Sequence, residues 1–510
     1  MDRTLKLGPQ TSLGSANPMT PAASAISDKK PILIIAGLIL MAAIVMAPTP
    51  AGLSVAGQRM LGVMAFTVLM WISEAIPYGV SAIALIGLTI VFLGFAPAHG
   101  VSGPLLGTAK AIPLAMSGFV SSGWVFVAAG LFIAAAITST GLERRLAYLI
   151  IRMVGTKTTS IIAGVIITAF VLTFLIPSVI ARAATLVPIV LGLNASFGLP
   201  ANSKIGKALL LLAGILPSVT GVGVLTGAAP NPVVVTFLTN AGHPAISWIE
   251  WLYYAFPYTV LLGLGLYFLM TQMYRFEFAE LPGGREYLNK CLHDLGPMSR
   301  GEKRVAVIMT ITILLWATDK IHHIDASAVS VFSVLMLIMP YLGVSTWNEL
   351  YKRVDWTSIL LFGAGISMAE IFTSTGAARW LSQALFVDSG VGRLPTTALA
   401  LAIFALVFLV RFCFTSITSC LTAITPAILG FLTALGNPSV PVTGIVMGVC
   451  LIAQCTAVIP VTSAPAMIAY GAGGFTARDM IRLSIPLTLV MFALILLFMF
   501  TYWPWIGLWH

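Results

Sequence analysis

The sequence FLIPSVIAR, residues 174–182, interrupts a long apolar block that extends from residue 158 to residue 195. Its proline lacks the backbone N–H that a continuous helix requires. A second apolar block, residues 396–432, is interrupted by the sequence SITS, which begins at Ser416. In both blocks a proline follows the serine by ten residues. We therefore predict two helical hairpins with non-helical tips.

The composition places these hairpins in a membrane protein. The chain has 510 residues, of which 58% are hydrophobic and only 9% are charged, and its mean hydropathy is +1.00. Soluble proteins carry about 25% charged residues, so this chain has too few charges to cover a soluble surface. The same numbers exclude collagen, coiled coils, disordered chains and disulfide scaffolds. The fold class is therefore all-α and polytopic, with the lipid bilayer as a partner.

Apolar stretches predict about eleven transmembrane helices in addition to the two re-entrant hairpins. The polar N-terminus is predicted to be a flexible cytoplasmic tail, and a polar stretch in the middle is predicted to connect two repeats. The predicted division is a tail at 1–30, an extra first span at 31–48, repeat 1 at 58–274 with a hairpin at 158–195 and a broken helix at 207–239, a cytoplasmic loop at 275–304, and repeat 2 at 305–503 with a hairpin at 396–432 and a broken helix at 442–474.

The two repeats are visible as matching segments at a nearly constant spacing. The sequence TSTG occurs at 138–141 and again at 373–376. Thr226, in the first broken helix, is matched at almost the same spacing by Thr462 in the second. Ordered matches of this kind indicate an internal duplication.

The lysines and arginines predict the orientation of the chain. With the N-terminus inside, 20 of the 27 lie on the cytoplasmic side, 5 lie outside and 2 lie in the hairpins. This arrangement puts Arg144 inside and its counterpart Arg379 outside, so the repeats are inverted and the C-terminus is external. The net charge of +10 therefore reflects membrane orientation, and no nucleic-acid partner is expected. Inverted repeats with paired broken helices are typical of secondary transporters, which bind substrate at the breaks.

Candidate binding residues lie at four interruptions that pair between the repeats. Broken helices present free N–H groups, which suit an anion, and free carbonyls, which suit a cation. A purely structural role, in which these small polar residues pack helix interfaces, stays open. The polar candidates are Ser178, Thr226, Ser416, Thr418, Thr422, Thr462 and Ser463.

Arg182 is a further candidate. A cation at the centre of a span costs at least ~2.5–3.5 kcal/mol, so it needs a partner. Arg182 either binds an anionic substrate or pairs with an acid such as Glu74, and we expect the first. Arg411 is expected to face a helix interface, and Glu74 and Glu370 are expected to be paired or solvated near span ends.

With these residues in place, the sequence resembles the divalent anion/sodium symporter family, which includes bacterial and plastid dicarboxylate and citrate carriers. The resemblance covers most of the chain. The matching segments are WISEAIP at 71–77, GLERR at 141–145, PSVIAR at 177–182, LTGAAPNP at 225–232, LGPM at 295–298, FTSIT at 414–418 and YGAGGFT at 470–476. The resemblance implies eleven spans plus two re-entrant hairpins, a homodimer, and a transport domain that moves like an elevator against a scaffold domain.

The resemblance also implies a function. We expect a secondary active transporter of small divalent anions, with di- or tricarboxylates as substrates, in the bacterial inner membrane. Transport would be either sodium symport or anion exchange. No cofactor is expected, apart from sodium if it is the coupling ion, and no catalytic or metal site. One alternative is a transporter of sulfate or another inorganic or sulfonate anion. A different class, a polytopic membrane enzyme, would need clustered acids or histidines at an interface, and the mixed charges of the 275–304 loop fit a solvated connection better.

The hairpin tips depart from the family pattern. The family carries Ser-Asn-Thr at each tip, whereas this chain has Ser178-Val179-Ile180 and Ser416-Ile417-Thr418. Since Val179 and Ile180 provide no side-chain oxygen for a cation, we expect weak sodium dependence or anion exchange. The resemblance adds Val179, Gly227 and Ile417 to the candidate substrate-binding residues. The candidate sodium ligands that it implies are Ser178, Gly227, Asn231, Ser416, Thr418 and Ala464.

Overall fold

The structure is a computed structural model that describes residues 21–155, 157–274, 276, 284–384, 394–455 and 458–509. In this part of the chain the secondary structure is helical, apart from one isolated β-bridge between Pro97 and Leu105. Nine of the described helices are long and apolar enough to cross a membrane, and five shorter apolar helices accompany them. The prediction of an all-α polytopic membrane protein is therefore confirmed.

Each stretch predicted to be a hairpin or a broken helix contains a pair of helices in the structure. The helices of the first repeat are α2 (Val55–Ser73), α3 (Tyr78–Gly94), α5 (Ser122–Thr140), α6 (Leu142–Val154), the hairpin α7 (Thr158–Leu175) and α8 (Val179–Ser196), the broken helix α9 (Lys204–Gly221) and α10 (Pro230–Asn240), and α11 (Trp248–Met273). Those of the second are α13 (Arg300–Ala317), α15 (Ala326–Ile338), α17 (Trp356–Ser374), α18 (Ala377–Ser382), the hairpin α19 (Thr396–Arg411) and α20 (Ile417–Ala434), the broken helix α21 (Val442–Cys455) and α22 (Ala464–Gly471), and α23 (Ala477–Leu497).

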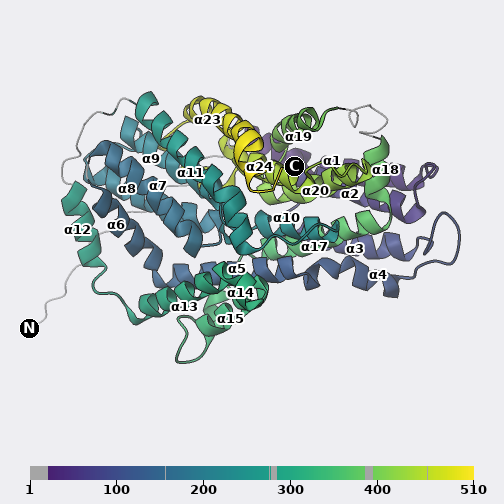
Figure 1. Cartoon of the computed structure of the whole chain (residues 1–510), viewed down its shortest axis with the longest axis horizontal. Coiled ribbons are helices and arrows are strands. Elements are labelled where there is room, and N and C mark those ends of the chain that lie inside the picture. Colours follow the sequence, from purple (N-terminus) through teal and green to yellow (C-terminus); the bar gives the residue numbers. More distant parts are fainter. Residues whose placement is uncertain are drawn as a thin grey trace, which may run out of the picture.

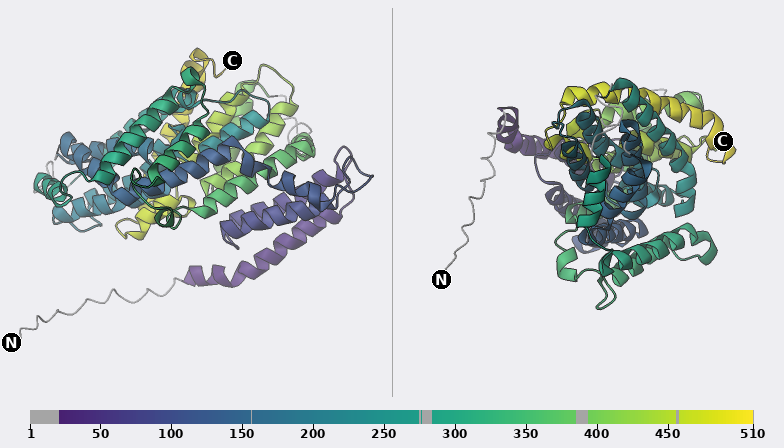
Figure 2. Two further views of the ribbon diagram at one scale, coloured as in Figure 1. Left: turned by 90° about the horizontal axis from the view of Figure 1, so that it is seen from below. Right: turned by 90° about the vertical axis from the view of Figure 1, so that its left-hand side faces the viewer.

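The molecule is elongated in Figure 1, with α6 to α9 towards one end and α2, α3 and α18 towards the other. Helix α1 (Pro21–Met46) packs along α2, and α4 (Thr108–Ala115) packs against α3. Helix α12 (Gly284–Asp294) packs against α6 and α8. Figure 2 shows α1 along one side of the bundle, at the end of the grey N-terminal trace.

The repeats interlock. Helix α10 of the first repeat packs against α20 of the second, and α22 of the second packs against α8 of the first. Two further helix pairs also join the repeats: α5 packs against α15, and α17 packs against α3. The second half of each broken helix therefore rests on the hairpin of the other repeat.

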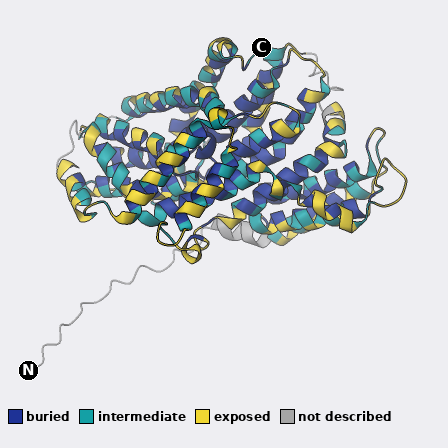
Figure 3. Cartoon of the chain, turned by 60° about the horizontal axis from the view of Figure 1, so that its bottom comes forward, coloured by how far each residue is buried: buried dark blue, intermediate teal, exposed yellow. Residues whose placement is uncertain are grey.

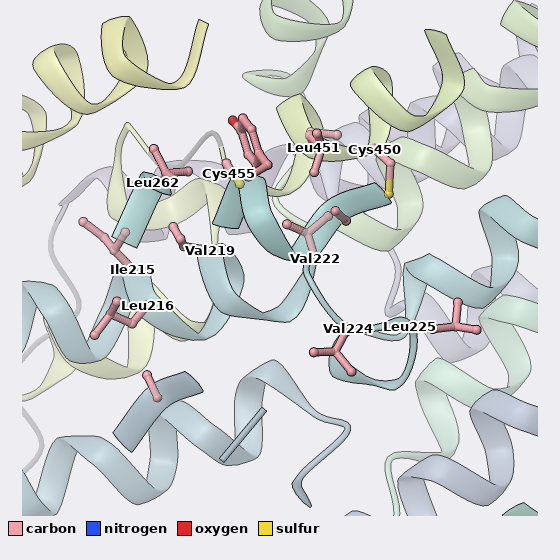
Figure 4. Close-up of a cluster of buried hydrophobic side chains, with 14 of the residues drawn as sticks. Ile215, Leu216, Val219, Val222, Val224, Leu225, Leu262, Cys450, Leu451 and Cys455 are labelled. Carbon is pink, nitrogen blue, oxygen red and sulfur yellow. The ribbon is translucent and has the colours of Figure 1, made fainter. Parts of the chain in front are cut away.

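The two broken helices also share a core. Buried apolar side chains from α9, from the break after it and from α21 form one cluster, shown in Figure 4. Its labelled members include Ile215, Val222, Leu225, Leu451 and Cys455. On the outside of the molecule, the yellow segments that mark exposed residues follow the outer faces of the helices in Figure 3. Several of these are large and apolar, such as Leu264 and Phe268 on α11, which suits contact with lipid.

Several boundaries differ from the sequence predictions. Helix α1 begins at Pro21, so ten residues of the predicted 1–30 tail are helical, and residues 1–20 lie outside the described part. The predicted 275–304 loop contains α12, while residues 275 and 277–283 lie outside the described part. After the broken helix predicted at 207–239, helix α11 begins at Trp248, where Ser247 and Glu250 form a capping box.

Candidate functional site

Four helices begin at one cavity of about 530 Å³. Its wall includes the first residues of α8, α10, α20 and α22, which are Val179, Pro230, Ile417 and Ala464. Two of these helices follow a hairpin tip, two follow the break in a broken helix, and each repeat supplies one of each kind. A helix N-terminus carries the equivalent of about half a positive charge, so the cavity is a place where an anion is stabilised.

The hairpin helices α8 and α20 are capped in the same way. Ser178 Oγ accepts a hydrogen bond from the backbone N–H of Ala181, and Ser416 Oγ accepts one from Ser419, both at 3.2 Å. Each cap uses the third N–H of its helix and leaves the first two for another partner. Those first two residues, Val179 with Ile180 and Ile417 with Thr418, all line the cavity. The tips therefore offer four backbone donors to an anion.

The wall of the cavity has no cationic side chain among the described residues that line it. Its two charged side chains are carboxylates, Glu74 at the end of α2 and Asp355 before α17. Glu74 accepts hydrogen bonds from the hydroxyls of Tyr78 and Thr415, which ties α2 and α3 to the residue before the second tip. The positive potential that would hold an anion here therefore comes from backbone, not from lysine or arginine on the wall.

Arg182 does not line this cavity. The side chain is fully buried, with 0% exposure, and its guanidinium points to backbone oxygens. Its two terminal nitrogens donate to the carbonyls of Ile176, 2.9 Å away in the first hairpin tip, and Pro217, 2.6 Å away in α9. In this arrangement the Arg182 side chain therefore does not reach a substrate in the cavity, contrary to the sequence prediction, and it is not paired with Glu74 either. The reason is local: one turn after the tip, the α8 face that carries Arg182 packs against α9.

Arg411 is buried in the same way at the other hairpin. It also has 0% exposure, and it donates to the carbonyls of Ala453 (2.9 Å), Phe414 and Thr462. The predicted position at a helix interface is correct. The hydrogen bonds themselves, which join the second tip to both sides of the second helix break, could not be foreseen from the sequence.

The carbonyls that the two arginines bind are equivalent in the two repeats. Ile176 and Phe414 each lie two positions before the serine that caps the helix after their tip. Pro217 and Ala453 are separated by the spacing that relates the two broken helices through the internal duplication. The arginines themselves are not equivalent, because Arg182 follows its tip and Arg411 precedes its tip. Each repeat therefore places a guanidinium at the same point of the fold from a different position in the sequence.

Asn231 joins the two broken helices. Its Nδ2 donates to the carbonyls of Gly221 (3.0 Å) and Val224 (2.8 Å) in the first break. Its Oδ1 accepts a 2.7 Å hydrogen bond from Nε2 of Gln454 on α21. Gln454 is 1% exposed and lines the cavity, and its Oε1 has no hydrogen-bond partner among the described residues. The sequence reasoning missed Gln454, although an amide within an apolar helix is a signal for a polar contact at membrane depth.

The structure divides the predicted site residues into two groups. Those that line the cavity are Ser178, Val179, Ser416, Ile417, Thr418 and Ala464. Those that lie behind the wall are Arg182, Thr226, Gly227, Asn231, Thr462, Ser463 and Thr422. Thr226 accepts a hydrogen bond from the Trp248 indole at 3.3 Å, so its hydroxyl stabilises the first break. Among the described residues, no three histidine, cysteine or acidic side chains gather in a way that could hold a metal ion.

The cavity is closed towards the other end of the bundle. A larger cavity of about 740 Å³ lies there, lined by Trp248 at the start of α11 and by Glu370 near the end of α17. Between the two cavities is a gap of only about 10 Å³, which shares Pro177 with the first and Phe126 with the second. This volume is at the lower limit for one water molecule, so the wall between the cavities is shut to an organic anion.

Comparisons with known proteins agree with this arrangement. A MtrF structure from Neisseria gonorrhoeae, whose title describes a class of antimetabolite efflux pumps, matches with a TM-score of 0.53. The match covers 85% of this chain and 96% of that one at 11% identity, so it supports the fold alone. A Cupriavidus necator relative described as a membrane protein is 34% identical over 93% of this chain and 92% of its own length. The L-tartrate/succinate antiporter of Escherichia coli is 26% identical over 91% of this chain and 96% of its own length.

The family model agrees over nearly the full length. The model described as the sodium:sulfate symporter transmembrane region matches residues 28–509. That range contains both hairpins, both broken helices and the cavity between them. The chain therefore belongs to the sodium:sulfate symporter family, the divalent anion/sodium symporters that its sequence resembles, and it is a multi-pass secondary transporter of anions rather than an enzyme.

Proposed function

We propose that this protein exchanges organic dianions, of the dicarboxylate class, across the bacterial inner membrane without a coupling sodium ion. The relative named as an L-tartrate/succinate antiporter matches over 91% of the chain and supports both the exchange mode and the substrate class. The four helix N-termini at one cavity support an anionic substrate. The observation that carries the proposal is the pair of guanidiniums behind the cavity wall.

The guanidiniums bind oxygens of the kind that a coupling cation would use. In secondary transporters, carbonyls at unwound helix ends coordinate the coupling ion. Here Arg182 donates to Ile176 and Pro217 at the first tip and break, and Arg411 donates to Phe414 and Ala453 at the second. An arginine side chain is always charged and offers five N–H donors. These fixed cations therefore bind the carbonyl oxygens that two sodium ions would coordinate in a sodium-coupled transporter.

Fixed cations also favour exchange over net transport. A sodium symporter releases its cations with the substrate, so the empty carrier can return uncharged. Arg182 and Arg411 cannot leave, and a buried charge without a counter-charge is costly in a membrane. A bound dianion adds two negative charges near the two guanidiniums, whereas the empty site has only Glu74 and Asp355 on its wall, neither of which is hydrogen-bonded to Arg182 or Arg411. The return step is therefore fast only when the site is loaded again on the other side.

The proposed transport cycle uses the closed gap as the barrier. With the N-terminus inside and the C-terminus outside, Glu74 and Asp355 face the cytoplasm, so the 530 Å³ cavity opens inward and the 740 Å³ cavity opens outward. An elevator movement of the hairpins and broken helices against the other helices, in a homodimer, would carry the cavity between the two sides. The orientation, the elevator movement and the homodimer are all part of this proposal.

Purified protein in liposomes tests the exchange mechanism. We expect labelled succinate to enter vesicles loaded with unlabelled succinate, and to enter empty vesicles at least ten times more slowly. Replacing sodium with potassium or choline should leave both rates unchanged. Succinate uptake into empty vesicles that rises steeply with sodium would refute the exchange mechanism. Uptake of sulfate that no dicarboxylate inhibits would favour the inorganic-anion alternative.

A further inference from the structure

The wall of the cavity between the helix N-termini is more apolar than a short hydroxylated dicarboxylate requires. Apolar side chains reach it from α8 and α20 at the tips, and from the second break and α22. The ones on which the inference rests are Val179, Ile180, Ile417, Val461, Met467 and Ile468. Ile180, Val461 and Met467 are 43%, 55% and 44% exposed although each lines a concave surface, so a large part of each side chain has no protein neighbour.

The tips themselves combine donors with apolar side chains. Val179 and Ile180 supply the first two backbone N–H groups of α8, and Ile417 supplies the first of α20. A carboxylate that accepts these hydrogen bonds brings the carbon next to it against the isoleucine side chains. The hydroxyl oxygens of Ser178 and Ser416 already accept the N–H groups that cap their own helices, so they are directed to the helix start rather than to the spacer of the substrate. The space beside each anion position is therefore suited to carbon.

Two groups of polar side chains at the wall are hydrogen-bonded internally, while Gln454 Oε1 has no partner in the described part of the chain. The Tyr78 and Thr415 hydroxyls donate to Glu74, and Ser358 donates to Asp355. The acids repel a second carboxylate placed at the mouth, which restricts the anionic ends to the helix N-termini deeper in the cavity. The volume of about 530 Å³ falls within the range of about 300–1,000 Å³ that is typical for drug-sized ligands. A four-carbon dicarboxylate would leave part of the apolar wall without a contact.

We propose that the preferred substrates are dicarboxylates whose two anionic ends are separated by an apolar spacer, either an alkyl chain or an aromatic ring. This inference rests on the proposed function, since it names the substrate class of the same site. Burial of a methylene group in such a wall strengthens binding about fourfold. A hydroxyl on the spacer would lose its water and find few free partners, which weakens binding.

A competition series tests the spacer. Purified protein in liposomes would exchange labelled succinate while unlabelled succinate, glutarate, adipate, pimelate, phthalate, malate or L-tartrate competes. We expect the inhibition constants to fall at least tenfold from succinate to adipate or pimelate, with phthalate also stronger than succinate, and malate and tartrate to be weaker than succinate. If malate or tartrate competes better than succinate and adipate, the inference is wrong.

Two matched variants connect the preference to the cavity wall. Ile180→Thr keeps the methyl group on Cβ and replaces the ethyl group at the tip with a hydroxyl, and should reduce the advantage of adipate over succinate at least threefold. Ile167→Thr changes an isoleucine of α7 that is equally exposed, at 44%, but does not line the cavity, and should preserve the full advantage. An unchanged preference in Ile180→Thr, with normal exchange, would overturn the assignment of the spacer to this wall.

The same experiments distinguish a failure of the spacer inference from a failure of the proposed function. If no dicarboxylate competes and none exchanges, the proposed function fails together with the inference. If short hydroxylated dicarboxylates exchange fastest, the proposed function stands and the spacer inference fails. In that case Gln454→Leu should remove the preference for the hydroxyl, because Gln454 Oε1 is a buried acceptor at the wall without a partner in the described part of the chain.

Discussion

Arg182 and Arg411 stabilise the two hairpin tips through hydrogen bonds to backbone oxygens rather than through an acid. Each guanidinium joins a carbonyl of its hairpin tip to a carbonyl near the end of the helix before the break, Ile176 to Pro217 and Phe414 to Ala453. An unpaired buried polar group costs about 1–3 kcal/mol. The arginine loses its own hydration but offsets this penalty by donating to two or three carbonyls at once.

The first prediction at this scale concerns Arg182→Ala. Because the carbonyls of Ile176 and Pro217 lose their donor, we expect a lower melting temperature and at least a tenfold loss of exchange. Guanidinium or methylguanidinium at low millimolar concentration, too dilute to denature, should restore part of both. Leu186→Ala, which also opens a cavity at a fully buried position of α8, is the control and should gain nothing from these ions. Rescue of both variants, or of neither, would contradict a cation role for Arg182.

The sequence could single out Arg182 but not its partners. A cation in an apolar block needs a partner, and this argument is correct for both arginines. The partners are carbonyls that come near only when α8 packs on α9 and α19 packs on α21. A hydrogen bond from a side chain to a backbone carbonyl leaves no pattern in the sequence, because every residue has a backbone carbonyl. The sequence analysis considered a substrate or Glu74 as the partner of Arg182. It did not consider backbone carbonyls, which are the partners in the structure.

At the scale of elements, the helix breaks were predictable and the short amphipathic helices were not. Glycine and proline at 221–232 mark the first break directly, and the hairpin tips follow from the Pro177-Ser178 and SITS signals. Helix α6 was missed because its apolar residues alternate with charged ones and no run of them is long enough to resemble a span. It nevertheless joins the ends of α5 and α7, and its Arg145 forms an ion pair of 2.7 Å with Glu302 at the start of α13.

Glu143 in the first turn of α6 makes the stability of this element dependent on pH. Burial raises the pKa of Glu143 to about 7, with a smaller contribution from Glu302, while Arg144 opposes the shift. Its Oε2 has no hydrogen-bond partner in the described part of the chain. The folded protein therefore holds this proton up to about pH 7, whereas the unfolded chain loses it near pH 4.5. Between these values the folded state binds more protons, so the contribution of Glu143 to stability falls as the pH rises.

The prediction compares Glu143→Gln with the parent protein. The amide removes the ionisation, so we expect the variant to be more stable by a few degrees at pH 8 and to show no such gain at pH 5. Thermal unfolding in detergent at a series of pH values measures the difference. Glu286→Gln on α12, where the carboxylate is exposed, provides a control that should be insensitive to pH. A gain that is equal at pH 5 and pH 8 would contradict the role of the buried carboxyl.

At the scale of the whole molecule, the internal duplication predicted which helices correspond, but it did not predict which helices touch. The nearly constant spacing of the matching segments identifies α8 with α20 and α10 with α22. The contacts cross between the repeats, with α10 on α20 and α22 on α8. Such crossing depends on how two similar units dock, and an unaligned single sequence contains no information about pairs of distant residues. The sequence analysis therefore predicted the four interruptions separately. It did not predict that they form the wall of one cavity.

Crossed contacts predict how the chain behaves when it is divided. We expect a polypeptide that ends at residue 276 and one that begins at residue 284 to give no dicarboxylate exchange when either is produced alone. Co-production should restore exchange, because each half supplies the surface on which the broken helix of the other rests. Co-purification of the two halves through a tag on one of them measures the assembly. Succinate exchange by either half alone would contradict a cavity built by both.

The helix contacts that cross between the two repeats also limit how such a molecule could have evolved. An ancestor with a single repeat would have had hairpins and broken helices but no opposite surface to receive them. In the inverted topology that the sequence predicts, two copies complete each other with one inserted upside down relative to the other, so the ancestral gene product would have had to enter the membrane in both directions. Joining the copies end to end would then give each half a permanent direction. The two guanidiniums that reach the same carbonyls from different sequence positions would then date from after that fusion, each half having acquired its own.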